Sequence, residues 1–150
     1  MDTDALLARL QVLEDERAIL QTLYQYGHAM DYGPDADFID CFMPLGVWDV
    51  RMRLIPDGAF TCAGHDEIAA SLEMQTSVRA PALFAKHLLI EPRISLDGNE
   101  ASVESYFVRI EPSDGAPTQI VASGRYLDHL IRCDDGRWRF THRIAEIDDM

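Results

Sequence analysis

Asp31 is the first residue of this chain whose position suggests chemistry. It ends a stretch, from about Asp4 to Asp31, in which apolar residues recur at steps of three and four, as on one face of an amphipathic helix. If Leu20 marks that face, at about 100° per residue, Asp31 lies only about 20° away from it. Tyr24 lies about 40° and His28 about 80° from the same direction. A carboxylate there must find a partner or lose its charge, because burying it alone is costly. The alternative is that Asp31 caps the helix or begins the following turn.

His87 is the second candidate, as the one imidazole in the apolar segment Phe84–Ile90. Side chains alternate along a strand, so His87 is expected to share a face with Leu89. A core histidine that bonds to a neighbouring backbone or hydroxyl group is the plainer interpretation of one such residue. Beside an inward carboxylate it would instead form a general base with its orienting group. The carboxylate would fix the tautomer, and imidazoles titrate near neutral pH.

The elements that would carry these residues come in a simple order, with helices first and long strands last. The expected helices cover residues 4–31 (with an interruption near Glu14-Asp15), 35–43 (ended by Pro44) and 64–76. Two short strands are expected at Val47–Arg53 and near Ala59–Cys62. Four long strands are expected at Leu83–Leu96, Glu100–Glu111, Thr118–Cys133 and Trp138–Ile147.

Tight-turn sequences separate the long strands and predict an antiparallel meander. These turns are Asp97-Gly98-Asn99, Ser113-Asp114-Gly115 and Asp134-Asp135-Gly136. Strands of this length imply a strongly curved sheet, and Pro92 predicts an edge or a bulge because it cannot donate a ladder hydrogen bond. We therefore expect one α+β domain over residues 1–150, with N-terminal helices packed on a mainly antiparallel sheet in a cone around one cavity.

The composition argues against several classes of partner. The chain has 13 Lys and Arg against 26 Asp and Glu, so its formal net charge is −13. Such a surface repels phosphate backbones and anionic lipid headgroups, so neither nucleic acid nor a membrane is an expected partner. The three cysteines lie far apart, which suits a reducing compartment. The N-terminal residues are acidic where a signal peptide is basic, so we expect a cytoplasmic protein.

No cofactor is expected, because the sequence contains no glycine-rich phosphate loop. His28, Asp31 and His87 could together bind a cation. However, no HxxxH, HExxH or paired-cysteine spacing supports a metal site, and none is expected.

Several segments form a further pattern. They are Ala18–Tyr26 followed by Asp31 and Phe42; Ala63–Ile68; Lys86–Leu88; Gly124–Asp128; and Gly136–Phe140 followed by Arg143. Together they resemble the SnoaL-like group of the NTF2-like superfamily over nearly the whole chain. The resemblance implies the same α+β cone. It does not single out a reaction, because relatives include dehydratases, ketosteroid-type isomerases, polyketide cyclases, dehydrochlorinases and non-catalytic subunits.

The resemblance also implies roles for individual residues. In the scytalone dehydratase and bile-acid dehydratase types, an Asp near the end of the first long helix acts with a His from the first long strand, and Asp31 and His87 match those positions. Tyr26 is similar to a tyrosine that acts in these dehydratases, whereas the helical geometry favours Tyr24, so both are candidates. Some of these enzymes add a second partner for the His from the next strand, which the region Glu104–Arg109 could supply.

The leading hypothesis is a cofactor-independent lyase or isomerase that acts on a small, largely apolar hydroxy- or oxo-compound, aromatic or steroid-like compounds included. His87 would remove a proton from carbon, Asp31 would orient it, and a tyrosine would assist at oxygen. The candidates for contacting the substrate are His28, Trp48, Phe107 and Arg143. One alternative is a non-catalytic ligand-binding or assembly module. Another is a polyketide cyclase, which would need a wider cavity.

Oligomerisation is also expected. Helices cover only one face of the predicted sheet, so the other face is expected to pair with further copies in a homodimer or homotrimer. The residues that alternate with the cavity-facing ones in the last three strands would form this contact.

Overall fold

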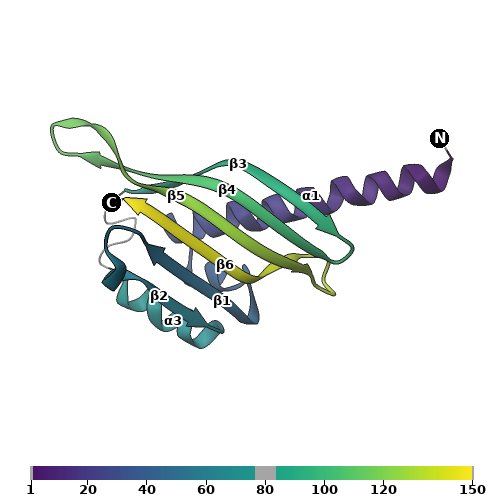
Figure 1. Cartoon of the computed structure of the whole chain (residues 1–150), viewed down its shortest axis with the longest axis horizontal. Coiled ribbons are helices and arrows are strands. Elements are labelled where there is room, and N and C mark those ends of the chain that lie inside the picture. Colours follow the sequence, from purple (N-terminus) through teal and green to yellow (C-terminus); the bar gives the residue numbers. More distant parts are fainter. Residues whose placement is uncertain (1, 77–83, 150) are drawn as a thin grey trace.

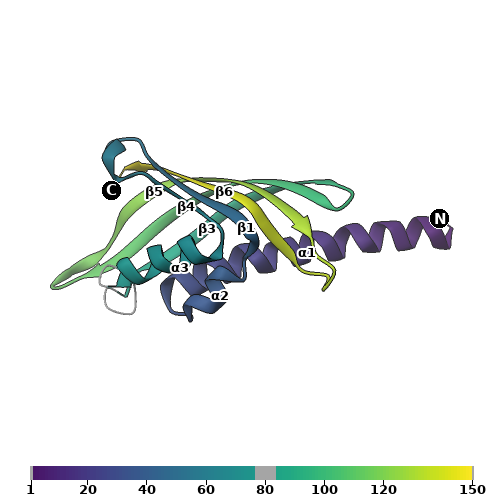
Figure 2. The ribbon, with the colours of Figure 1, turned by 90° about the horizontal axis from the view of Figure 1, so that it is seen from below.

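The computed structural model describes residues 2–76 and 84–149, and within them three helices lie against one face of a mixed sheet (Figures 1 and 2). The helices are α1 (Thr3–Asp31), α2 (Asp35–Ile39) and α3 (His65–Met74), with a short 3₁₀ turn at Pro56–Gly58. The strands are β1 (Phe42–Met52), β2 (Phe60–Ala63), β3 (Lys86–Asp97), β4 (Glu100–Ser113), β5 (Ala116–Arg132) and β6 (Trp138–Asp149).

The strand order in the sheet is β2-β1-β6-β5-β4-β3. The four strands from β3 to β6 form the expected antiparallel meander, while β1 lies parallel to β6 and antiparallel to β2. The sheet curves over the helices without closing into a barrel (Figure 2). The predicted α+β class with a curved, mainly antiparallel sheet is therefore confirmed. Leu83, where the first long strand was expected to begin, lies outside the described residues.

Two predicted helix boundaries are wrong. The helix α1 runs without interruption through Glu14-Asp15, and α2 ends at Ile39, well before Pro44. Pro44 instead lies inside β1, where the register against β6 shifts between Phe42 and Val47. An irregular stretch of this kind tolerates proline, because its residues are not all needed as ladder donors.

The contact of α1 with the sheet begins at Asp15. Its carboxylate accepts hydrogen bonds from the indole of Trp138 at 3.1 Å and from Arg132 at 3.3 Å. Two turns further on, the Thr22 hydroxyl donates to the backbone carbonyl of Trp138 at 2.5 Å. Every residue from Thr3 to Glu14 is exposed, so the first part of α1 projects beyond the sheet (Figure 1).

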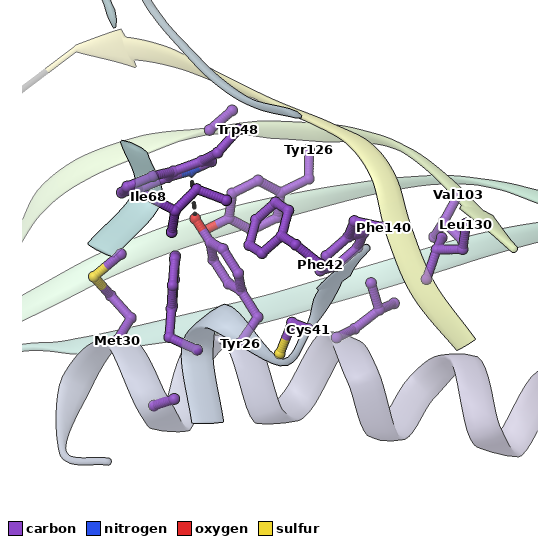
Figure 3. Packing of buried hydrophobic residues seen from close by; sticks show 14 of the residues in the cluster. Tyr26, Met30, Cys41, Phe42, Trp48, Ile68, Val103, Tyr126, Leu130 and Phe140 are labelled. Atoms are coloured by element: carbon purple, nitrogen blue, oxygen red, sulfur yellow. Dashed lines mark hydrogen bonds between the residues drawn. The ribbon is translucent and has the colours of Figure 1, made fainter. Parts of the chain in front are cut away.

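The core forms where the second half of α1 meets the concave face of the sheet (Figure 3). From α1 it takes Ile19, Leu23, Tyr26 and Met30, and from the other elements it takes mainly aromatic side chains. These are Phe38, Phe42, Trp48, Trp138 and Phe140. Each large apolar side chain that is fully buried contributes roughly 1.5–3 kcal/mol to folding. This aromatic cluster holds α1 at a fixed angle to the sheet and so determines where Asp31 lies.

The predicted irregularity at Pro92 is confirmed. The strand β3 lies at one edge of the sheet, and its register against β4 shifts between Ile90 and Arg93. His87 and Leu89 are both partly buried whereas Lys86 and Leu88 are exposed, as the period of two predicts. The His87 side of β3 therefore faces the helices.

The close approach of β5 and β6 depends on Gly124. A Cβ atom at this position would lie 1.9 Å from the backbone oxygen of Glu146 and 2.9 Å from the Phe107 ring. We expect Gly124→Ala to lower the free energy of unfolding by about 1–3 kcal/mol or more, because backbone must move to admit the methyl group. Chemical denaturation monitored by circular dichroism measures this loss.

The matched control is Gly27→Ala, on α1. A Cβ there would meet only the backbone oxygen of His87, at an ordinary 3.7 Å. Alanine is the better helix former by about 1 kcal/mol, so this variant should be as stable as the wild type or more so. Equal losses in both variants would show that Gly124 has no special role in the sheet.

Candidate active site

A cavity of about 330 Å³ lies between the helices and the concave face of the sheet. Its wall is mainly apolar and includes Trp48 and Phe107, two of the residues expected to contact a substrate. Among the described residues, the polar side chains that reach it are Tyr26, Asp31, Gln75, His87, Arg109 and Tyr126. An apolar pocket with a few convergent polar groups is the usual form of a small-molecule site.

The side chains of Asp31 and His87 are joined by a hydrogen bond at the cavity wall. Asp31 Oδ1 lies 2.6 Å from His87 Nδ1, and Oδ2 accepts the backbone N–H of His87, also at 2.6 Å. The Asp31 side chain is 8% exposed and the His87 side chain 21%. One carboxylate thus holds both the ring and the backbone of His87.

This geometry assigns the two ring nitrogens of His87. Ionised Asp31 can only accept, so Nδ1 carries the proton that lies between them. In neutral imidazole the other nitrogen, Nε2, then has a lone pair available as a base. His87 lines the cavity, so its imidazole lies within reach of a bound ligand.

The structure separates the two candidate tyrosines. Tyr26 lies in the cavity wall and is 4% exposed, whereas Tyr24 is 43% exposed and lies outside the cavity. The helical geometry that favoured Tyr24 is therefore wrong, because the buried face of α1 is centred near Leu23 and Tyr26 and not near Leu20. The hydroxyl oxygen of Tyr26 accepts a hydrogen bond from the indole of Trp48 at 3.1 Å (Figure 3).

His28 lies outside the cavity as well. It is exposed and borders a second hollow, a groove of about 440 Å³ between α1 and β3. Tyr24, Lys86 and Leu88 also line this outer groove, and all three are exposed. Asp31 and His87 border both the groove and the cavity.

Arg143 does not reach the cavity, so its expected contact with a substrate is not observed. Its side chain is fully buried and forms an ion pair with Asp128, which is also fully buried. The strand pairing explains this arrangement, because Asp128 of β5 and Arg143 of β6 are directly opposite each other on the concave face. The guanidinium lies behind Tyr26 and Tyr126, which separate it from the cavity.

Tyr126 and Asp128 were not among the predicted site residues. Tyr126 lies in the cavity wall, stacked on Phe107 with 4.5 Å between ring centroids. A signal was available, since Gly124, Tyr126, Asp128 and Leu130 alternate along β5 and all are buried. The period of two therefore places an aromatic hydroxyl and a carboxylate on the cavity face.

Arg109 lies directly opposite His87 in the strand pairing and lines the cavity. It forms an ion pair with Glu111. A guanidinium has donors and no acceptor, so Arg109 cannot accept a hydrogen bond from the imidazole. In the region Glu104–Arg109, the residue opposite His87 is thus suited to bind a ligand oxygen and not to serve as a second acceptor for the histidine.

Burial keeps the polar groups of the tyrosine wall protonated. It raises the pKa of Tyr26 to about 12, although Arg143 and the Trp48 hydrogen bond act in the opposite direction. It also raises the pKa of Tyr126 well above its ordinary value of 10.0. Both hydroxyls therefore remain hydrogen-bond donors at neutral pH. Burial likewise raises the pKa of Asp128, to about 7, against the effect of Arg143.

In the part of the chain that the structure describes, no three His, Cys, Asp or Glu side chains are grouped so that they could hold a metal ion. Nor does any described helix combine the length and the apolar character needed to cross a membrane.

The helices on one face of a curved sheet, with a cavity between them, are the architecture of NTF2-like proteins. The family model for the SnoaL-like domain matches residues 11–144, and the chain belongs to this family. Among functionally curated proteins, none matches this chain closely enough to serve as a relative.

Several solved structures share the fold. An NTF2-like protein with a cystatin-like fold from Novosphingobium aromaticivorans has a TM-score of 0.83 at 23% identity, covering 97% of this chain and 90% of its own. A protein of the same organism, provisionally named the beta subunit of an aromatic-ring-hydroxylating dioxygenase, has a TM-score of 0.75 at 21% identity, covering 94% and 92%. A third, provisionally named a scytalone dehydratase, has a TM-score of 0.67 at 22% identity, covering 97% and 88%. These likenesses establish the fold and leave the reaction open.

Proposed function

We propose that this protein is a cofactor-independent lyase or isomerase that moves a proton on carbon in a small, largely apolar hydroxy- or oxo-compound. The observation that carries the proposal is the carboxylate of Asp31, which holds both the ring and the backbone of His87 at the wall of an apolar cavity. A carboxylate–imidazole pair in such a place is a general base with its orienting group.

The reaction would begin at His87. Its Nε2 takes a proton from the carbon next to a carbonyl group. The C–H electron pair forms a carbon–carbon double bond, and the π electron pair of the carbonyl moves to its oxygen to give an enolate. The hydroxyls of Tyr26 and Tyr126 donate to this oxygen. The imidazolium then returns the proton to another carbon in an isomerisation, or to a departing hydroxide on the β carbon, which gives water and a new double bond.

Two alternatives receive less support. In a purely structural pair both sides of the imidazole would be enclosed, whereas the His87 side chain is 21% exposed and faces the cavity. Cyclisation of a polyketide would need a wider cavity than about 330 Å³, which is near the lower end for ligand sites.

Deuterium exchange tests the proposal directly. β-Tetralone, a two-ring apolar ketone with acidic C–H bonds, is incubated with the protein in D₂O, and mass spectrometry follows the uptake of deuterium. A β-hydroxy ketone on the same frame tests elimination, because loss of water produces a fluorescent naphthol. Catalysed uptake or elimination supports the proposal. If neither the deuterium uptake of the ketone nor the dehydration of the hydroxy ketone is faster with the protein than in buffer, the protein acts as a binding or assembly module.

We also propose that the chain assembles with further copies of itself. Leu6, Leu10 and Leu13 form a stripe on the projecting part of α1, where they are 55%, 48% and 62% exposed. An isolated helix of about a dozen residues is only marginally stable in water, so this segment needs a partner surface. A stable interface takes about 800 Å² from each partner, more than one short stripe supplies. The outer face of the sheet, with exposed Tyr106 on β4, offers further apolar area on the same chain.

Exchanging the stripe for polar residues tests the assembly. We expect the wild type to be a dimer or trimer by light scattering coupled to size exclusion, and Leu6→Ser/Leu10→Ser/Leu13→Ser to be a monomer. Val12→Ser is the control, because Val12 is 47% exposed on the same helix but points away from the stripe. A wild type that is monomeric at all concentrations would rule the assembly out.

A further inference from the structure

The ion pair between Asp128 and Arg143 is completely enclosed. Both side chains are 0% exposed. Arg143 Nη2 donates to Asp128 Oδ2 at 3.1 Å, and Nε lies 3.0 Å from Oδ1 without the alignment of a hydrogen bond. The pair does not line the cavity, although both residues lie on the concave face of the sheet.

Three aromatic rings surround the guanidinium. Its central carbon lies 3.8 Å from the ring centroid of Tyr126, 4.0 Å from that of Tyr26 and 4.5 Å from that of Phe140. Within the described residues, Arg143 Nε and Nη1 have no hydrogen-bond partner. The ring faces therefore add cation–π attraction to the charge compensation that Asp128 provides.

Stability alone does not account for this arrangement. Removing two charges from water is expensive, and apolar side chains of similar volume are often at least as stabilising as a buried ion pair. What distinguishes the pair is its location, because two of the three rings on the cation also form the cavity wall.

We propose that Arg143, held in place by Asp128, is a positioning residue that acts through Tyr26 and Tyr126 to direct two hydroxyl donors at a ligand oxygen that gains negative charge. This inference rests on the proposed proton-transfer function and narrows its substrate class. The substrate is a carbonyl compound with an apolar, ring-sized body, and its oxygen becomes an enolate.

The contacts of the two tyrosines support this role. The hydroxyl of Tyr26 accepts from Trp48 and so has its own proton to donate elsewhere. Tyr126 is fixed by its stack on Phe107, and the centroids of the two tyrosine rings are 5.7 Å apart. Arg143 also lowers the pKa of both tyrosines against the larger effect of burial, which makes their hydroxyls stronger donors than burial alone would leave them.

Naphthol binding tests the proposal without any turnover. Fluorescence titrations compare naphthalene, β-naphthol and a cyano-substituted β-naphthol, whose oxygen is progressively better able to carry charge. The test variant is Arg143→Met/Asp128→Leu, which removes both charges together. The preference is the ratio of the affinity for the cyano-naphthol to the affinity for naphthalene. In the variant we expect this ratio to be about tenfold or more below that of the wild type, as for the loss of a charge-assisted hydrogen bond. The affinity for naphthalene should be unchanged.

The control is Arg125→Gln. Arg125 lies on β5 and pairs with Glu146 of β6 at 2.6 Å, but it is exposed on the outer face of the sheet. This variant should keep the full naphthol preference. If the double variant keeps it too, or loses affinity for naphthalene by the same factor, Arg143 only supports the wall and the proposal is wrong.

A second cycle tests the route through the tyrosines. In a Tyr26→Phe/Tyr126→Phe background, removing the charge pair should no longer change the naphthol preference, whereas an undiminished change would overturn the proposal. If Arg143→Met/Asp128→Leu fails to fold by circular dichroism, Arg143→Lys takes its place, because lysine keeps the charge and loses the planar group. It should lose the preference and still bind naphthalene, and an unchanged preference would contradict the proposal. Deuterium uptake by β-tetralone in the wild type remains a separate measurement, so failure of the proton-transfer function is distinguishable from failure of this one.

Discussion

Replacing His87 by glutamine is expected to slow deuterium uptake by β-tetralone about 10²–10⁴-fold, the usual contribution of a positioned general base. Glutamine retains a side-chain amide that can still donate to Asp31, so the cavity wall is disturbed little. The rate is measured by mass spectrometry at saturating ketone, and the dissociation constant of the ketone is measured separately. The loss is expected in the rate, with binding nearly unchanged.

The control for this prediction is His129→Gln. His129 is exposed on β5, where its ring contacts the Ser102 hydroxyl at 3.2 Å on the outer face of the sheet. Its replacement should leave the rate unchanged. If His87→Gln exchanges deuterium as fast as the wild type, another group removes the proton and the role assigned to the dyad is wrong.

Asp128→Leu is expected to lower the free energy of unfolding by about 3–5 kcal/mol at pH 8.5, because it leaves the Arg143 cation buried without its partner. Arg143→Met should cost less, since the isolated carboxyl can take up a proton whereas a guanidinium cannot release one. The double variant Arg143→Met/Asp128→Leu should recover most of the loss. Urea denaturation of the four proteins gives the coupling between the two residues. If the double variant loses as much stability as the two single variants together, the prediction is contradicted.

The same pair makes stability depend on pH. Burial raises the pKa of Asp128 to about 7, from an ordinary value of 3.8. Between these two pH values the folded state holds a proton that the unfolded state has released, so the free energy of unfolding falls as pH rises through this window. Above it both states are ionised and the effect is complete. We expect this fall to be absent from the double variant, in denaturation series from pH 4 to pH 8.

Local patterns in the sequence were enough to single out Asp31, on the apolar stripe at the end of a helix, and His87, in a strand of period two. The structure places these two side chains in contact. The local patterns were not enough to orient α1. Its outer side carries a regular stripe of Leu6, Leu10 and Leu13. This stripe lies on the same side of the helix as Leu20, on which the helical wheel was centred. The buried face is on the other side, where the aromatic cluster of the sheet contacts Leu23. Only tertiary packing distinguishes a stripe that enters the core from one that remains exposed.

Pairing across the sheet was the other information that the sequence lacked. The alternation of β5 indicates which of its residues face the cavity, but not which residue of β6 lies opposite each of them. Counted from the turn that joins the two strands, Asp128 meets Arg143 because the register shifts between His129 and Leu130. Irregularities of this kind depend on the contacts of the whole sheet. The enclosed ion pair therefore became visible only in three dimensions.

The position of Asp31 and His87 between the inner cavity and the outer groove determines the fate of any proton that the imidazole takes. Half of the residues that line the groove are exposed, so solvent can reach Asp31 and His87 from the side opposite the cavity. A proton taken from carbon can then be replaced by one from water before it returns. Deuterium placed on the reacting carbon of the substrate would therefore be lost to the solvent. The product would carry hydrogen from water at the position that receives the proton.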